Sequence, residues 1–153
     1  MRNQIFFATH SEKVISKALL HRIQNLVIVL NQEKGVLTAK KIITPSVLPS
    51  VTSAETNYLA FGISTVDYHI ELYGYLQIRE SKNTIKDADE YIRMSARYDA
   101  AIHYKPYTHG HTTYQTLPTY IRNCIDHPDP AYSYTAEELE ISTKLLIEIL
   151  KTP

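Results

Sequence analysis

The sequence predicts an all-helical fold, a mostly antiparallel bundle of about five helices in one domain over residues 1–153. Apolar residues recur at spacings of three and four over long segments, several of these segments open with helix-capping signals, and none shows the alternation of a strand. The 153 residues, of which 44% are hydrophobic, suffice for one proper core and are too few for two comfortable ones.

The capping signals mark where four helices should begin. Each signal is a small polar residue followed three positions later by glutamate, an arrangement that satisfies two free amide donors at a helix N-terminus. The four pairs are Thr9 with Glu12, Thr52 with Glu55, Asp87 with Glu90, and Thr135 with Glu138.

Apolar spacing and breaker residues extend these starts into helices. We expect the first over residues 9–35, with Gly35 as its stop, then a connection over 35–51. A longer helix should run over 52–78 and a third over 88–102. The last helix should open at Thr135 and pack back on the helix before it.

The remaining helix should begin near Thr116, with Pro118 in its first turn. It cannot continue through Pro128, which lacks an amide hydrogen and disfavours helical geometry in the residue before it. His127 should therefore turn out of the helix at its C-terminal end.

Arg122, Asn123 and His127 lie on the last turns of that helix. Asn123 and His127 are four apart and share a face, whereas Arg122 and His127 point roughly 140° apart on an ideal helix. Two arrangements would bring the arginine and the histidine together. Either the last turn distorts before Pro128, or a second copy of the chain brings its arginine to this histidine.

The pattern Arg122-Asn123-x-x-x-His127 resembles the signature of the HEPN superfamily. The resemblance implies an all-helical bundle that dimerises so that two signatures meet. It also implies a metal-independent RNA endonuclease of a toxin–antitoxin or phage-defence system, with Arg122, His127 and Asn123 in its active site and no cofactor. Other members of that superfamily have lost activity and only bind.

The implied reaction needs a proton acceptor for the 2′-hydroxyl, a proton donor for the 5′-oxygen, and positive charge at the phosphorus. Histidine suits the proton transfers because its ordinary pKa is about 6.5. Arginine suits the phosphate because its planar, always charged fork can grip two oxygens. Asn123 would orient the imidazole or contact the substrate. The products would be a 2′,3′-cyclic phosphate and a 5′-hydroxyl.

Two alternatives compete with a ribonuclease, a catalytically silent adaptor and a plain helical scaffold. Arg122 could pair with Asp126, four residues on, while His127 merely caps the helix end. The chain would then be a catalytically silent adaptor that binds a partner protein, such as an antitoxin or an ATPase. Asp129 stands where HEPN toxins with a nucleotidyltransferase antitoxin often carry a tyrosine, which argues against that mode of control.

Residues 103–116 show neither helical nor strand periodicity and are rich in histidine and tyrosine. A connection of this length in a compact domain is usually functional or disordered, and we expect it to contact RNA or a partner protein. The candidate contacts are Lys105, Tyr107, His109 and His111. Histidines 103, 109 and 111 would suit zinc or nickel, but no nearby cysteine or paired carboxylate completes a ligand set, so we expect no metal.

Charge and composition limit the partners and the location. The formal net charge is zero, so nucleic-acid binding must depend on local patches. Arg93 and Arg97, four apart on one predicted helix face, would form a phosphate track if they line the same groove as Arg122. Cys124 is the single cysteine, which excludes an internal disulfide and suits a reducing cytoplasm. No apolar run approaches membrane-spanning length, so we expect a cytoplasmic protein.

Overall fold

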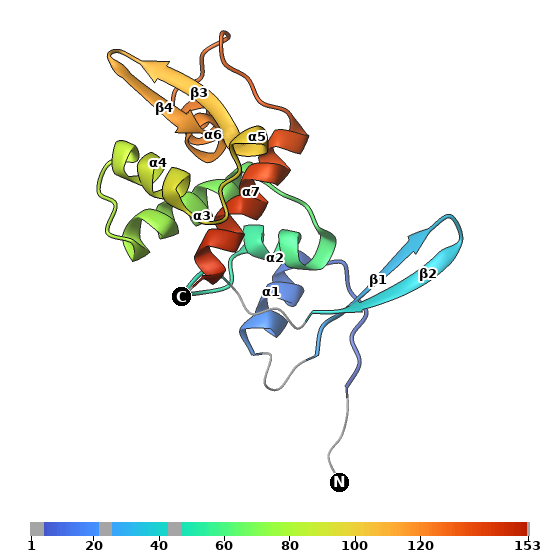
Figure 1. Ribbon diagram of the computed structural model, residues 1–153. Coiled ribbons are helices and arrows are strands. Elements are labelled where there is room, and N and C mark those ends of the chain that lie inside the picture. Colours follow the sequence, from blue (N-terminus) through green and yellow to red (C-terminus); the bar gives the residue numbers. More distant parts are fainter. Residues whose placement is uncertain (1–4, 22–25, 43–46, 153) are drawn as a thin grey trace. The chain divides into compact units, whose positions relative to one another are not determined.

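The computed structural model describes residues 5–21, 26–42 and 47–152, apart from the side chains of Glu12, Asn31 and Glu33 (Figure 1). These residues form seven helices and two antiparallel two-stranded sheets, so the fold is mixed α/β and the prediction of an all-helical bundle is wrong. The contacts divide the chain into two compact units, Met1–Ile63 and Ser64–Pro153. The single domain stays a prediction.

The first unit contains a hairpin where a helix was predicted. The helix α1 covers only Glu12–Leu20, and the strands β1 (Ile28–Glu33) and β2 (Val36–Lys41) pair antiparallel after it. Lys34 and Gly35 form the turn with φ of 49° and 82°, the left-handed geometry that suits a two-residue hairpin. Gly35 therefore turns a hairpin instead of ending a helix, and residues 22–25 of the predicted helix lie outside the described residues.

Local capping explains the other boundaries of this unit. Ser11, not Thr9, is the residue before α1, and its side chain makes no capping hydrogen bond. Thr52 caps α2 (Ser53–Phe61) as predicted, because its hydroxyl accepts a hydrogen bond from the amide of Glu55 at 3.1 Å. The buried residues that join the two helices are Ile15, Leu19 and Ala60.

Two predicted helices are each broken in two. The helix expected over 52–78 stops at Gly62, whose φ of 70° is left-handed, and α3 (Val66–Arg79) starts afresh after the cap Thr65. The helix expected over 88–102 is α4 (Ile85–Met94) followed by the short α5 (Ala100–His103). Thr84 caps α4 in place of the predicted Asp87, whose amide donates to the Thr84 hydroxyl at 3.1 Å.

The segment over 103–116 forms a second hairpin. The strands β3 (Tyr104–His109) and β4 (Thr112–Thr116) pair antiparallel, with an irregular register between Tyr104 and Tyr107. Gly110 supplies a left-handed turn residue with φ of 58°. The expectation that this segment lacks secondary structure is therefore wrong.

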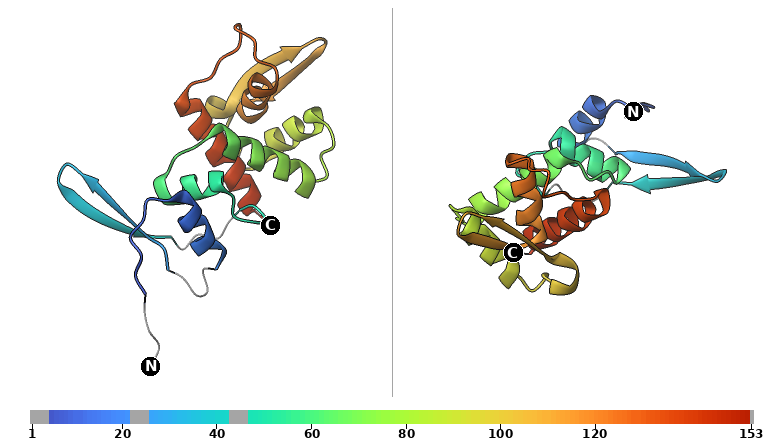
Figure 2. Two further views of the ribbon diagram at one scale, coloured as in Figure 1. Left: turned by 180° about the vertical axis from the view of Figure 1, so that it is seen from behind. Right: turned by 90° about the horizontal axis from the view of Figure 1, so that it is seen from above.

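The last two helices begin as predicted. Thr116 caps α6 (Leu117–Asp126), which has Pro118 in its first turn and ends at His127. Thr135 and Glu138 form a complete capping box at the start of α7 (Ala136–Lys151). In the second unit α7 packs against α3 and α6, and the hairpin packs against α6 (Figures 1 and 2). None of the helices in the described part of the chain is long and apolar enough to span a bilayer.

A buried carboxylate, Asp89 of α4, holds the start of α6 and the end of β4. Its oxygens accept hydrogen bonds from the amides of Gln115 at 2.9 Å and Thr116 at 3.0 Å, and from the Thr116 hydroxyl at 2.7 Å. The Thr119 hydroxyl lies 3.0 Å from those of Thr116 and Tyr73. Burial, ahead of the other influences, raises the pKa of Tyr73, so this network stays protonated at the phenol.

His69 of α3 is fully buried against α7. Its Nε2 lies 2.8 Å from the Ser142 hydroxyl, and its Nδ1 has no hydrogen-bond partner among the described residues. Burial lowers its pKa from 6.5 to about 3, because the charged imidazolium would lose its hydration in this core. The folded chain therefore holds His69 neutral.

Replacing Asp89 with alanine should lower the free energy of unfolding by about 3 kcal/mol, because the buried amide and hydroxyl of Thr116 and the amide of Gln115 lose their acceptor at once. Urea denaturation measures the loss. The control is Glu90→Ala, the exposed next residue of α4, which should cost less than about 0.5 kcal/mol. Equal losses in the two variants would contradict the role of Asp89.

His69 should make the chain less stable in mild acid. The unfolded chain takes up a proton at this residue below about pH 6.5, and the folded chain does so only near pH 3. The free energy of unfolding is therefore highest above pH 6.5. As the pH falls toward 3, it decreases by up to about 1.4 kcal/mol for each pH unit. Between pH 7 and pH 5, urea unfolding should show a smaller drop in the free energy of unfolding for His69→Gln than for the wild type. Identical drops in the two proteins would refute this assignment.

Candidate functional site

The candidate site lies at the C-terminal end of α6. The amide of His127 donates to the carbonyl of Asn123 at 2.9 Å and closes the last turn, and the chain then leaves the helix toward Pro128. The buried face of α6, which includes Ile121 and Cys124, packs into the core. His127 is exposed at the helix end, as predicted.

Arg122 is held by its own helix. One guanidinium nitrogen lies 2.6 Å from Asp126 Oδ2, and the other donates to Asn123 Oδ1 at 3.0 Å. The arginine side chain is only 23% exposed, so the planar fork has a defined position. In the described residues no hydrogen bond or ion pair joins Arg122 to His127. The pairing with Asp126 considered from the sequence is thus formed, and one chain does not bring the arginine to the histidine.

Asn123 positions Arg122 and does not face solvent. The residue is 4% exposed, and its amide nitrogen has no hydrogen-bond partner among the described residues. Its side-chain oxygen accepts from Arg122, and its carbonyl accepts from the amide of His127. Asn123 therefore links the other two signature residues through the helix, with its side chain directed at the arginine.

The hairpin brings a second histidine to the first. The rings of His109 and His127 stack, with centroids 5.6 Å apart and planes 16° from parallel. Both side chains are exposed. This contact joins the tip of β3 to the end of α6, a proximity that the separation of 18 residues in the sequence does not suggest.

Tyr107 anchors the hairpin and is unavailable for stacking on a base. It is 3% exposed, and its ring meets Tyr120 edge-on at 6.0 Å and Tyr132 at 4.5 Å. The hydroxyl of Tyr132 also donates to the carbonyl of Thr108 at 3.3 Å. These contacts fix β3 up to the residue before His109.

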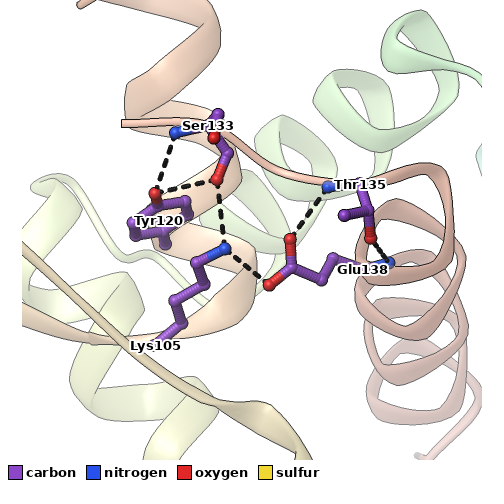
Figure 3. A network of polar contacts seen from close by, with 5 residues as sticks. All are labelled: Lys105, Tyr120, Ser133, Thr135 and Glu138. Atoms are coloured by element: carbon purple, nitrogen blue, oxygen red, sulfur yellow. Dashed lines mark hydrogen bonds and ion pairs between the residues drawn. The ribbon is translucent and has the colours of Figure 1, made fainter. Parts of the chain in front are cut away.

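Lys105 is likewise engaged in contacts within the fold (Figure 3). Its ammonium donates to the carbonyl of Ser133 at 3.1 Å, pairs with Glu138, and lies 4.4 Å over the ring of Tyr120. Burial alone would raise the pKa of Glu138, but hydrogen bonds from Lys105 and the Thr135 amide bring it below its usual value. Lys105 therefore ties β3 to α7, which leaves its charge compensated and not free for phosphate.

The other predicted contacts are exposed but do not form the predicted track. Arg93 lies 4.0 Å from Glu90, and Arg97 follows the end of α4 at Met94, so the two arginines do not share a helix face. Arg97 lines a cavity of about 720 Å³ whose lining does not include Arg93. His111 is exposed in the hairpin turn.

The three histidines considered for a metal do not belong to a group of three possible ligands among the described residues. His103 is buried, and its Nδ1 accepts from the amide of Asp99 at 2.9 Å, which makes it part of the local fold. Burial lowers its pKa, against a smaller opposing effect of Asp99. Within residues 5–21, 26–42 and 47–152, no three His, Cys, Asp or Glu residues are grouped to hold a metal ion.

Cys124 is a buried thiol beside the site. It borders a cavity of about 530 Å³ formed with residues 128–130 and 132–134. Burial, ahead of the other influences, raises its pKa, so the thiol stays protonated and is a poor nucleophile. This agrees with its place on the buried face of α6.

No family model matches the chain, and neither the curated proteins nor the solved structures include a significant match. The His109–His127 contact was missed because the hairpin was missed. Its signal was the run of tyrosines and threonines on both sides of Gly110, which is typical of a hairpin.

Replacing Lys105 with methionine should lower the free energy of unfolding by about 1–2 kcal/mol. Methionine keeps an unbranched apolar side chain but loses the hydrogen bond to Ser133 and the ion pair with Glu138. Thermal denaturation should show a melting point several degrees lower. Lys86→Met, at an exposed lysine of α4, is the control and should melt like the wild type. Unchanged melting together with weaker RNA binding would instead assign Lys105 to phosphate contact.

Proposed function

We propose that this chain is a metal-independent endoribonuclease that cleaves RNA through the 2′-hydroxyl. The observation that carries the proposal is an exposed imidazole, His127, at the end of the helix that also holds the guanidinium of Arg122 in a fixed position. This is the arrangement that the resemblance to the HEPN signature implies for an active site. It supplies a proton-transfer group and a phosphate-binding group from one short segment.

The reaction would draw on His127 and Arg122 in separate roles. The imidazole exchanges a proton with the ribose 2′-hydroxyl or with the departing 5′-oxygen. The guanidinium binds two phosphate oxygens as negative charge gathers at phosphorus. The products are a 2′,3′-cyclic phosphate and a 5′-hydroxyl, and DNA is inert because it lacks the nucleophile.

Asp126 would regulate access to the arginine. In the structure its carboxylate lies 2.6 Å from one nitrogen of the guanidinium. A substrate phosphate must therefore share the guanidinium with Asp126 or displace Asp126 from it. A partly exposed ion pair of this kind contributes only about 0–1 kcal/mol, which a phosphate diester in the site can offset. Asn123 would keep the fork oriented during the exchange.

A second candidate is favoured by the same ion pair. With its charge neutralised by Asp126, Arg122 is a surface structural residue, and the chain would act as a catalytically silent adaptor of a defence or toxin–antitoxin system. The neutral net charge agrees with a protein partner. The candidates differ in one measurable property, which is cleavage of RNA.

The proposal includes a homodimer in the cytoplasm. Within one chain Arg122 faces Asp126 and Asn123, so a two-fold pairing of α6 helices would supply a second arginine to each His127. An antitoxin or an ATPase on another polypeptide would be the partner that controls the dimer. No metal and no cofactor enter the proposed reaction.

Purified protein should cleave labelled single-stranded RNA in the presence of EDTA and leave the matching DNA intact. His127→Ala should lower the rate at least 100-fold, because loss of a proton-transfer group typically costs 10²–10⁴-fold. Since His127 is exposed, the melting curve of the His127→Ala variant should match that of the wild type. Gel analysis of the products measures the rate and identifies the cyclic phosphate end.

His10→Ala, which removes an exposed histidine of the first unit, is the control and should cleave normally. Arg122→Ala should also abolish cleavage, with a modest loss of stability because its side chain is only 23% exposed. No cleavage of several RNAs by the wild type would reject the ribonuclease and favour the adaptor. Cleavage that EDTA abolishes would reject the metal-independent chemistry.

A further inference from the structure

Two exposed imidazoles from separate elements meet beside the proposed cleavage site. His109 ends β3 and His127 follows α6, and their rings lie 5.6 Å apart and nearly parallel. The resemblance to the HEPN signature supplies only the histidine of α6. Within one chain, this single imidazole leaves one of the two proton transfers in RNA cleavage without an assigned group.

The packing behind His109 gives this contact a defined position. Tyr107, two residues earlier, is buried among tyrosine rings, and the carbonyl of Thr108 accepts a hydrogen bond from Tyr132. On the other strand, Thr113 pairs with Thr108 in register, and their hydroxyls lie 3.0 Å apart. The hairpin is thus fixed close to its tip, and His109 projects from the last pair of the ladder.

The titratable groups near His109 and His127 in the sequence make contacts elsewhere, so they leave the two imidazoles available for proton transfer. Asp126 is engaged with Arg122, and the carboxylate of Asp129 accepts from the amide of Ala131 at 2.8 Å. The remaining titratable neighbours in the sequence are His111, in the hairpin turn, and Tyr132, whose hydroxyl donates to Thr108. In the described part of the chain, neither His109 nor His127 forms an ion pair with a carboxylate.

The ring geometry suits proton transfer better than metal binding. Imidazole lone pairs lie in the ring plane, so two nearly parallel rings direct them side by side and not at one common point. The described residues also supply no third ligand to form a group of three. A phosphodiester lying along the ring edges would instead present its 2′-hydroxyl and 5′-oxygen to different imidazoles.

We infer that His109 is a second catalytic residue, which divides the general acid and base work of RNA cleavage with His127 inside one chain. This inference rests on the proposed ribonuclease function. One imidazole removes the 2′-hydroxyl proton as the 2′-oxygen bonds to phosphorus. The other imidazole, protonated, gives its proton to the 5′-oxygen as the bond from phosphorus to that oxygen breaks. Exchange with water then restores both rings.

The test compares four proteins in single-turnover cleavage of RNA across a range of pH, with EDTA present. His109→Ala removes the ring, His109→Phe keeps a ring that can stack on His127 but cannot transfer a proton, and His10→Ala is the control. Wild type and control should show a bell-shaped pH dependence. Both His109 variants should lose at least 100-fold and one limb of the bell.

A second substrate assigns the roles. Uridine 3′-(p-nitrophenyl phosphate) has a leaving group that departs without a proton, so the variant that lacks the general acid should cleave it nearly as fast as the wild type. The variant that lacks the base should remain slow. This split between His109→Ala and His127→Ala is expected only if the two histidines have separate proton-transfer roles.

Each contrary result has its own meaning. Near-normal cleavage by His109→Phe would show that the ring only positions His127, and near-normal cleavage by His109→Ala would remove any role; either result overturns the inference and leaves the ribonuclease standing. A wild type that does not cleave RNA overturns both. Circular dichroism melting checks that the variants are folded, and His109→Gln replaces any variant that is not.

Discussion

The second unit depends on a buried carboxylate, Asp89, which forms no ion pair with any residue that the structure describes. Asp89 takes three hydrogen bonds from the junction of β4 and α6, and through Thr116 and Thr119 it connects α4 to Tyr73 of α3. A buried anion requires this many donors, so its surroundings have little freedom to rearrange. The junction is where β4 ends and α6 begins. Its position therefore helps set where the other end of β4, which pairs with His109 of β3, lies relative to His127 at the end of α6.

Polar groups in this unit divide into those that hold the fold and those left for chemistry. His69 and Lys105 are committed to internal contacts, Lys105 through Ser133 and Glu138 of the α6–α7 connection and α7. Two exposed imidazoles, His109 and His127, meet where α6 ends, on the helix that also carries Arg122. Stability and the candidate activity can therefore be perturbed separately, which is what makes the histidines informative targets.

Capping by threonine was predictable from sequence at Thr52 and Thr135, because the interaction is local, whereas the same pattern at Thr9 does not cap α1. Glycine was ambiguous: Gly35 was interpreted as a helix stop, yet a left-handed residue also turns a hairpin, and the pairing of the two strands that flank it decided between the two. The helix end at His127 followed from Pro128 alone. The stack with His109 depends on strand register and on Tyr107 packing, neither of which residue spacing reports.

The position of His109 on a two-stranded ribbon has a thermodynamic consequence. Beyond its anchored residues, the ribbon tip has no third strand beside it, and such tips open locally at lower free-energy cost than a packed core. If only a fraction of chains holds the two rings together at any moment, the apparent affinity for a ligand that needs both is reduced by that fraction. A ligand that engages both rings would raise the stacked population, so its binding and the ordering of the ribbon tip are thermodynamically linked.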